Sequence, residues 1–193
     1  ATSEGDFHAA LNFAAVLRSR TIFFCQNNGF AISTKTEQQT KSKTIAEKAF
    51  AYGMQGIKVD GNDVLALIIA LKEAKEMAKN NTPTLVEAST YRLSDHTTTD
   101  NAKLYREDDE VKEKLKEEPI SRFEKYLISL KILDQEKINQ IKEDAKKEVE
   151  SISKEALAEK DPELTEMFDY LLEKTYPELE LQKKALLQEY SNQ

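Results

Sequence analysis

The first hundred residues alternate short β-rich apolar runs with segments of helical spacing. This order is typical of parallel strands joined by helical crossovers. Gly53 follows one helical segment and favours its termination there, because glycine readily takes the left-handed conformation at a helix end. The expected helices are residues 9–17 (nearly all apolar and buried), residues 45–52, and a helix that runs through residues 66–77, is capped by Asn62 or Asp63 and is ended by residues 80–83. The expected strands are 21–25 (a core strand), 56–59 and 84–88.

From residue 107 onward, Lys, Glu, Leu and Ile recur with helical spacing, which predicts several helices. Pro119, Pro162 and Pro177 each stand where a first-turn proline begins a helix, since that position has no intrahelical N–H bond to lose. Residues 136–160 also allow a coiled coil, although the apolar stripe is interrupted. We therefore predict an α/β fold with a mainly parallel sheet in residues 1–106 and a helical extension in residues 107–193.

Composition narrows the class of protein. A chain of 193 residues with 39% hydrophobic residues is long enough to bury one sizeable core. A net charge of −7 argues against nucleic-acid binding, because such a surface repels a phosphate backbone. No apolar run reaches the roughly 20 residues that cross a bilayer, so no membrane is expected. Cys25 is the single cysteine, which favours a reducing, cytoplasmic location.

A polar segment directly after the first strand is the main candidate for chemistry. Residues 26–30 read Gln-Asn-Asn-Gly-Phe, and ligands of open α/β sheets bind at the carboxyl ends of strands. An amide oxygen there can ligate Mg²⁺, although Asn-Asn-Gly is also an ordinary turn sequence. Residues 2–6 precede the first helix, where N–H groups can meet an anion or where Ser3 or Asp6 simply caps the helix.

The loop at residues 91–106 is longer than most connections, which raises its functional interest. His96 within it can donate to a phosphate or exchange a proton, but an exposed loop histidine is often silent. Arg92 and Arg106 flank the loop and are expected to hold its shape through Asp95 or Asp100, or to pair on the surface without function. His8, beside the apolar helix, is expected to be a packed structural residue.

Taken in order, these motifs resemble the alpha subunit of the first component of thiamine-diphosphate-dependent 2-oxo acid dehydrogenases. Matching segments are residues 1–8 (Ala-Thr-Ser-Glu-Gly-Asp-Phe-His), 25–34, 59–63, 83–88 and the loop from Tyr91 through His96 to Arg106. The resemblance covers nearly the whole chain and implies a thiamine-diphosphate-binding fold.

The resemblance also implies the site residues. Asn28 through its side chain and Phe30 through its carbonyl would bind Mg²⁺, and His96 would serve catalysis in acyl transfer to the lipoyl group. The family's acidic metal ligand belongs to a Gly-Asp-Gly turn that falls before Ala1. The chain has no initiator Met, so we expect an N-terminally truncated subunit that is inactive alone. The thiamine diphosphate contacts would be Ala1, Gln26, Asn28, Phe30, Ser33 and His96.

By the same resemblance, the partners are a beta subunit in an α2β2 heterotetramer and the lipoyl acyltransferase core of the complex. The beta subunit supplies the glutamate that activates the thiamine ring. The expected reaction is oxidative decarboxylation of pyruvate with acyl transfer to lipoamide, because residues 40–61 resemble bacterial pyruvate enzymes. Branched-chain 2-oxo acid or acetoin dehydrogenase subunits, and a non-catalytic assembly fragment, are the alternatives.

Overall fold

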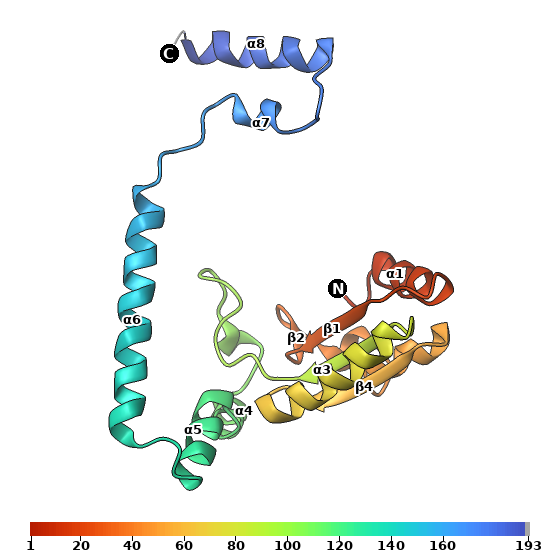
Figure 1. Ribbon diagram of the computed structural model, residues 1–193, viewed down its shortest axis with the longest axis vertical. Helices are drawn as coiled ribbons and strands as arrows, with labels where there is room; N and C mark the ends of the chain where they lie inside the picture. Colours follow the sequence, from red (N-terminus) through yellow and green to blue (C-terminus); the bar gives the residue numbers. More distant parts are fainter. Residues whose placement is uncertain (192–193) are drawn as a thin grey trace. The chain divides into compact units, whose positions relative to one another are not determined.

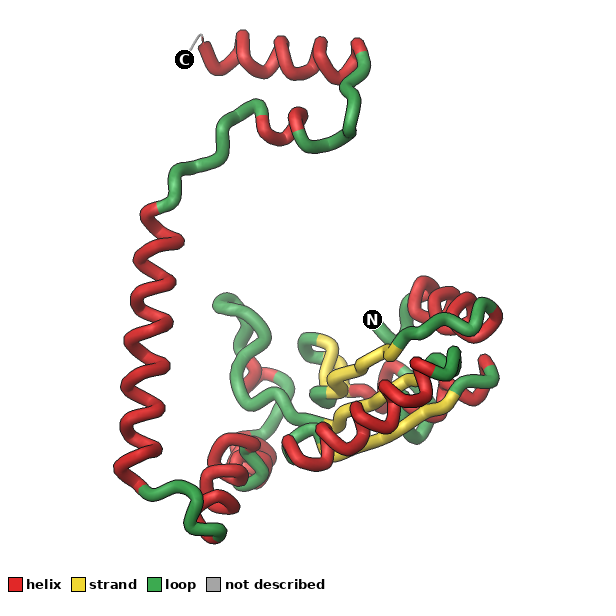
Figure 2. Tube along the Cα trace, viewed as in Figure 1, coloured by secondary structure: helices red, strands yellow, loops and turns green. Residues whose placement is uncertain are grey.

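The computed structural model describes residues 1–191, which form two compact units, one from Ala1 to Asp134 and one from Gln135 onward. The first unit contains a three-stranded parallel sheet with the strand order β1-β5-β4 (Figure 2). The predicted α/β class with a parallel sheet is confirmed. Its strands are β1 (Ile22–Asn27), β4 (Gln55–Asp60) and β5 (Thr84–Ser89), and a two-stranded antiparallel hairpin is formed by β2 (Phe30–Ala31) and β3 (Thr34–Lys35).

Helix α3 (Val64–Lys79) connects β4 to β5 and lies along the sheet (Figure 1). Asp63 caps it by accepting hydrogen bonds from the N–H groups of Leu65 and Ala66, as one of the two predicted caps. Its buried residues, Ala70, Ala74 and Ala78, are small and share one face, which allows a close approach to the strands.

The 3₁₀ helix η1 (Ala46–Tyr52) packs against β4 and β5. Gly53 ends it in the left-handed conformation (φ 70°), as predicted. Gly56 of β4 lies directly beneath η1: a Cβ there would stand 2.1 Å from the carbonyl oxygen of Ala46. Only glycine permits this contact. The core between η1, the sheet and α1 (Gly5–Val16) consists of Leu11, Ile45, Ala49, Met54 and Leu85.

Two burial predictions were wrong. Residues 9–17 do lie mostly in helix α1, but only Leu11 and Ala14 are buried, and Phe13, Val16 and Leu17 are exposed. The run is apolar on all sides, whereas a helix lying on one small sheet buries a single face. Strand β1 is likewise half-buried at an edge of the sheet, and the central strand β5 holds the core position instead.

After the long loop, with its short 3₁₀ helix η2 (Ala102–Leu104), all described elements are helices. Pro119 and Pro177 begin α5 and α8 as predicted, whereas Pro162 lies in an irregular segment four residues before α7, so that prediction was wrong. No helix of residues 1–191 is both long and apolar enough to span a membrane. Besides α1 and α3, the described α-helices are α2 (Thr36–Gln39), which precedes the loop, and α4 (Asp108–Leu115), α5 (Pro119–Ser129), α6 (Gln135–Ala158), α7 (Glu166–Asp169) and α8 (Pro177–Ser191), which follow it.

The predicted domain boundary between residues 106 and 107 stays a prediction. The break between compact units comes later, after Asp134, because side chains of α4 and α5 hold these helices to the sheet and its loops, as described below.

Candidate functional site

Three parallel strands end at one edge of the sheet. Asn27, Asp60 and Ser89 are the last residues of β1, β4 and β5, and they lie in register with one another. The carboxyl edge of such a sheet is where open α/β folds bind ligands. The segments that leave this edge are the β2–β3 hairpin, the turn into α3 and the loop that carries His96.

A cavity of about 330 Å³ opens beside β1 and the hairpin. Four of the six residues predicted to contact thiamine diphosphate line it, namely Ala1, Gln26, Asn28 and Phe30. Ser33 and His96 are exposed and lie outside this lining. The structure therefore gathers residues from the N-terminal segment and the end of β1 around one space, with apolar walls from Phe7, Phe23, Phe24, Ile45 and Leu85.

Two side-chain turns shape the Asn-Asn-Gly-Phe segment. The Asn28 Oδ1 atom accepts the Phe30 N–H at 3.1 Å, and the Asn27 Oδ1 atom accepts the Gly29 N–H at 3.2 Å. Gly29 takes a left-handed backbone (φ 85°), which a glycine adopts without strain. Asparagine favours such turns because its amide oxygen reaches the backbone two residues on. The segment is thus a defined turn.

Beneath this turn, Glu87 of β5 is almost fully buried at 1% exposure. Its Oε1 atom accepts the Asn27 Nδ2 amide at 2.8 Å, and its Oε2 atom accepts the Ala46 N–H at 2.9 Å. Buried carboxylates are costly unless they are hydrogen-bonded, and both oxygens here have a partner. The pKa of the nearby Cys25 thiol is raised, first by burial and then by the charge of Glu87.

Aromatic rings connect the hairpin to the loop that carries His96. The Phe30 ring meets the Tyr91 ring edge-on at 5.9 Å between centroids, and the Tyr105 ring lies 6.0 Å away. The Arg92 guanidinium lies over the Phe30 ring at 5.5 Å and donates to the carbonyl of Ile32 at 2.7 Å. The phenylalanine thus has a defined place among rings and a cation.

The loop that carries His96 is held by a second set of hydrogen bonds. The Asp100 carboxylate accepts hydrogen bonds from the backbone N–H of His96 at 2.8 Å and from the Tyr105 hydroxyl at 2.6 Å. The Tyr105 hydroxyl in turn accepts from the Arg92 guanidinium at 2.7 Å. These donors, the Tyr105 hydroxyl foremost, lower the pKa of Asp100. The carboxylate therefore fixes the backbone on which His96 stands, while the His96 side chain is exposed.

The arginines shape the loop, but not through direct pairing with Asp95 or Asp100. Arg106 donates to the carbonyls of Arg92, Leu93 and Ser94, and Asp95 accepts the Ala102 N–H at 2.9 Å. A planar guanidinium can serve several carbonyls at once, which suits a loop whose backbone lacks sheet partners. His8 forms a 2.5 Å contact with the Tyr52 hydroxyl and is partly buried, as expected of a packed histidine.

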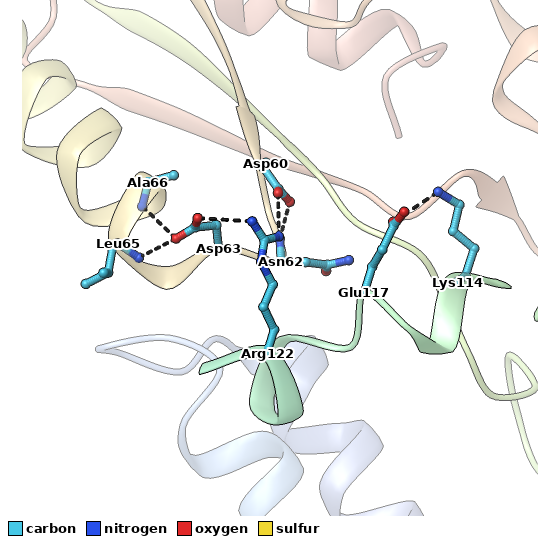
Figure 3. Close-up of polar contacts among 8 residues, drawn as sticks. All are labelled: Asp60, Asn62, Asp63, Leu65, Ala66, Lys114, Glu117 and Arg122. Atoms are coloured by element: carbon cyan, nitrogen blue, oxygen red, sulfur yellow. Dashed lines mark hydrogen bonds and ion pairs between the residues drawn. The ribbon is translucent and has the colours of Figure 1, made fainter. Parts of the chain in front are cut away.

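Arg122 of helix α5 holds this helix to the carboxyl end of β4 (Figure 3). We call this contact the clamp at Arg122. Its guanidinium donates to Asp60 Oδ2 at 2.6 Å and to Asp63 Oδ2 at 3.2 Å. This hydrogen bond to Arg122 is the main reason that the pKa of Asp60 is lowered. On α4, Glu110 accepts from the Tyr91 hydroxyl at 3.1 Å and lies 3.8 Å from the Lys35 ammonium. The helices thereby brace both the turn into α3 and the hairpin.

The donor set at the turn suits part of a magnesium site. Asn28 offers an amide oxygen and Phe30 a carbonyl, both neutral oxygen donors of the kind that Mg²⁺ binds. Within residues 1–191, no three His, Cys, Asp or Glu side chains gather closely enough to hold a metal. The described residues thus fit a metal that takes its remaining ligands from water, a diphosphate or another segment.

Sequence reasoning missed the buried pair of Asn27 and Glu87, the brace at Glu110 and the clamp at Arg122. One signal was available: Glu87 interrupts a run of strand residues that are otherwise apolar or small, and a charge at a core position needs a specific partner. Arg122 and Asp60 lie 62 positions apart in the sequence, and Glu110 is equally remote from Lys35 of the hairpin. No local sequence pattern indicates such contacts.

Comparison with known proteins gives consistent relatives. The chain is 46% identical over 182 residues to the 2-oxoisovalerate dehydrogenase subunit alpha of Caenorhabditis elegans, which covers 94% of this chain and 41% of the relative. It is 40% identical over 188 residues to the corresponding Arabidopsis thaliana subunit alpha 1, covering 96% of this chain and 40% of the relative. With the 3-methyl-2-oxobutanoate dehydrogenase subunit alpha of Mycobacterium tuberculosis it shares 41% identity over 187 residues, covering 96% and 51%.

The chain therefore spans about half the length of these relatives or less. A sequence model described as dehydrogenase E1 component matches residues 1–165, most of the chain. Together, these findings show that the chain belongs to the dehydrogenase E1 component family.

Proposed function

We propose that this chain forms part of the alpha subunit of a thiamine-diphosphate-dependent 2-oxo acid dehydrogenase. The observation that carries the proposal is the cavity at the carboxyl edge of the sheet, which is lined by Ala1, Gln26, Asn28 and Phe30. The chain's membership of the dehydrogenase E1 component family supports it. When bound, thiamine diphosphate supplies the carbon nucleophile and the electron sink for decarboxylation of a 2-oxo acid.

The chain's own residues would divide the binding task. The Asn28 amide oxygen and the Phe30 carbonyl would hold Mg²⁺, which bridges readily to phosphate oxygens. Gln26 and Ala1 line the same cavity and would contact the diphosphate. Ser33, in the turn between β2 and β3, would be a further cofactor contact. The apolar wall that includes Phe23 and Leu85 would limit water around the cofactor.

His96 would act at the stage of acyl transfer to lipoamide. An imidazole on an exposed loop can reach an incoming lipoyl group and exchange a proton with it. Asp100 and Tyr105 fix the backbone at His96, so its position does not depend on the ring's own contacts. The proposed partners are a beta subunit in an α2β2 assembly and the lipoyl acyltransferase core.

We propose a branched-chain 2-oxo acid as the substrate. The three relatives reported above are named for 2-oxoisovalerate or 3-methyl-2-oxobutanoate, and none of these names supports the pyruvate preference expected from residues 40–61. Two of the names include a mitochondrial location, while the cytoplasmic location of this chain remains a proposal based on its single cysteine.

Substrate competition tests the proposal. The subunit containing this chain, assembled with its beta partner, is assayed with 3-methyl-2-oxobutanoate and with pyruvate, using an artificial electron acceptor. We expect kcat/KM to favour the branched substrate by about tenfold or more, since two extra methyl groups in an apolar pocket contribute that much. A preference for pyruvate overturns the substrate, and turnover independent of thiamine diphosphate overturns the enzyme class.

A further inference from the structure

We propose that Glu87 is a positioning residue that sets the geometry of the metal-binding turn through the side chain of Asn27. The inference rests on the proposed function, because it concerns how the turn that carries Asn28 and Phe30 is held ready for Mg²⁺. Neither Glu87 nor Asn27 is offered as a metal ligand.

The hydrogen-bond partners of Glu87 define which chemical group can stand there. Its two oxygens face two donors, the Asn27 Nδ2 amide at 2.8 Å and the Ala46 N–H at 2.9 Å. A glutamine in the same place would accept at one atom only and would turn its own NH₂ group toward the other donor. Because the residue is 1% exposed, water cannot repair that mismatch. The site thus requires a carboxylate.

Glu87 also decides which way the Asn27 amide faces. Since the Nδ2 group must point to the carboxylate, the Oδ1 atom must point to the turn. There it accepts the Gly29 N–H at 3.2 Å and the Thr36 hydroxyl at 3.1 Å. A flipped amide would set an NH₂ group against the Gly29 donor. One buried carboxylate therefore fixes the residue next to Asn28 and joins the turn to the start of α2.

The backbone completes the same arrangement. The carbonyl of Asn27 accepts the Thr90 N–H at 2.9 Å, and the carbonyl of Gly29 accepts the Thr36 N–H at 2.9 Å. Residues on either side of Asn28 are thus held by bonds that a ligand does not need to break. The Asn28 Oδ1 atom, which accepts the Phe30 N–H and keeps a second lone pair, and the Phe30 carbonyl are the groups that would face a cation. Residues that orient metal ligands in this way commonly change metal affinity by about 10- to 100-fold when replaced.

The test measures Mg²⁺ binding as well as turnover. In the assembled enzyme with saturating thiamine diphosphate, the Mg²⁺ dissociation constant is determined by calorimetry for Glu87→Gln, Asn27→Ala and the double variant. We expect each single variant to weaken Mg²⁺ binding about tenfold or more. Turnover at saturating Mg²⁺ should stay within about twofold, and the double variant should bind Mg²⁺ no more weakly than Asn27→Ala, since Glu87 acts on the turn through Asn27.

Two matched variants separate positioning from general stability. Val86→Ala removes two methyl groups from a fully buried side chain of the same strand, one residue away and outside the cavity lining, and should lower stability without weakening Mg²⁺ binding tenfold. Glu76→Gln changes an exposed carboxylate on α3 and should alter neither property. If Glu87→Gln does not fold, Asn27→Ala carries the same prediction, because Asn27 is only partly buried.

Equal Mg²⁺ affinity in the parent enzyme, Glu87→Gln and Asn27→Ala overturns the positioning role. A loss of affinity no greater than that of Val86→Ala overturns it as well. If the parent enzyme itself binds no Mg²⁺ with thiamine diphosphate, the proposed function fails instead, and the two failures are thereby distinguished.

Discussion

Replacing Gly56 with alanine should displace η1 and weaken the hydrogen-bond network beneath the Asn-Asn-Gly-Phe turn of residues 27–30. The added Cβ would stand 2.1 Å from the Ala46 carbonyl oxygen and 2.9 Å from its carbonyl carbon, whereas ordinary contacts begin near 3.4 Å. Both atoms belong to the backbone, so no side chain can rotate away. Helix η1 must shift by roughly 1 Å in a densely packed core.

The size of the effect follows from three contributions. Overpacking costs about 1–3 kcal/mol. Displacing η1 also weakens the hydrogen bond from the Ala46 N–H to the buried Glu87 carboxylate, a loss of about 1.5–3 kcal/mol for a bond to a charged group. Replacing a strand glycine by alanine returns about 0.5–1 kcal/mol. We expect a net destabilisation of about 1.5–5.5 kcal/mol.

Hydrogen exchange of the β5 amides measures this effect within one element. A loss of about 2 kcal/mol corresponds to exchange about 30-fold faster. Gly5→Ala is the matched control, because no atom lies within 4 Å of the Cβ position there, and it should leave β5 exchange unchanged or slightly slower. Unchanged β5 exchange in Gly56→Ala, or equal acceleration in both variants, would refute the packing of η1 on Gly56.

Three further predictions concern single side chains, those of Arg122, Tyr105 and Cys25. Arg122→Gln should change stability only slightly, because the pair is about half exposed, and it should raise the NMR-measured pKa of Asp60 toward its ordinary 3.8. As a carboxyl whose pKa is lowered on folding, Asp60 adds stability that is present above that value and lost as pH falls through its folded pKa, so the variant should lose stability less steeply below about pH 4. Tyr105→Phe removes the hydroxyl shared by Arg92 and Asp100, so limited proteolysis should cut the loop around His96 faster, and parent-like cleavage would contradict the role of the hydroxyl. The Cys25 thiol should react with iodoacetamide more slowly than a free cysteine at pH 8, since burial and Glu87 raise its pKa, and equal rates would contradict this.

Much of the sheet could be predicted from the sequence because its signals are local. A continuous apolar run, a glycine after a helix and an aspartate before one each indicate an element without reference to the rest of the chain. Strand β5, the left-handed Gly53 and the Asp63 cap were all found this way. The family assignment, made from ordered motifs, is confirmed by the matching family model.

Burial was harder to predict because it depends on what covers an element. The apolar residues of α1 indicated a buried helix, yet Phe13, Val16 and Leu17 are exposed in the described chain. Composition reports which residues tolerate burial, whereas the sheet beside α1 covers only one of its faces. The helix predicted to begin at Pro162 is absent from the part of the chain that the structure describes, for a similar reason. A proline permits a helix to start but does not supply the contacts that stabilise the helix.

The candidate site was predicted only where a motif carries its own chemistry. The Asn-Asn-Gly-Phe turn and the loop that carries His96 were singled out from the sequence, and the structure brings Ala1, Gln26, Asn28 and Phe30 to one cavity. The contacts of Glu87 with Asn27 and of Arg122 with Asp60 join residues about 60 positions apart. Such pairings depend on strand order, which hydrophobic spacing does not specify.

The most direct test of the account is calorimetric titration of Mg²⁺ and thiamine diphosphate into the assembled enzyme, with Asn28→Ala as the variant and Asn62→Ala, on the turn into α3, as the control. We predict that the parent and the control bind the two together, and that Asn28→Ala binds Mg²⁺ at least about tenfold more weakly because it lacks the amide oxygen. Equal affinity in Asn28→Ala, or no binding by the parent enzyme, would contradict a cofactor site at the end of β1.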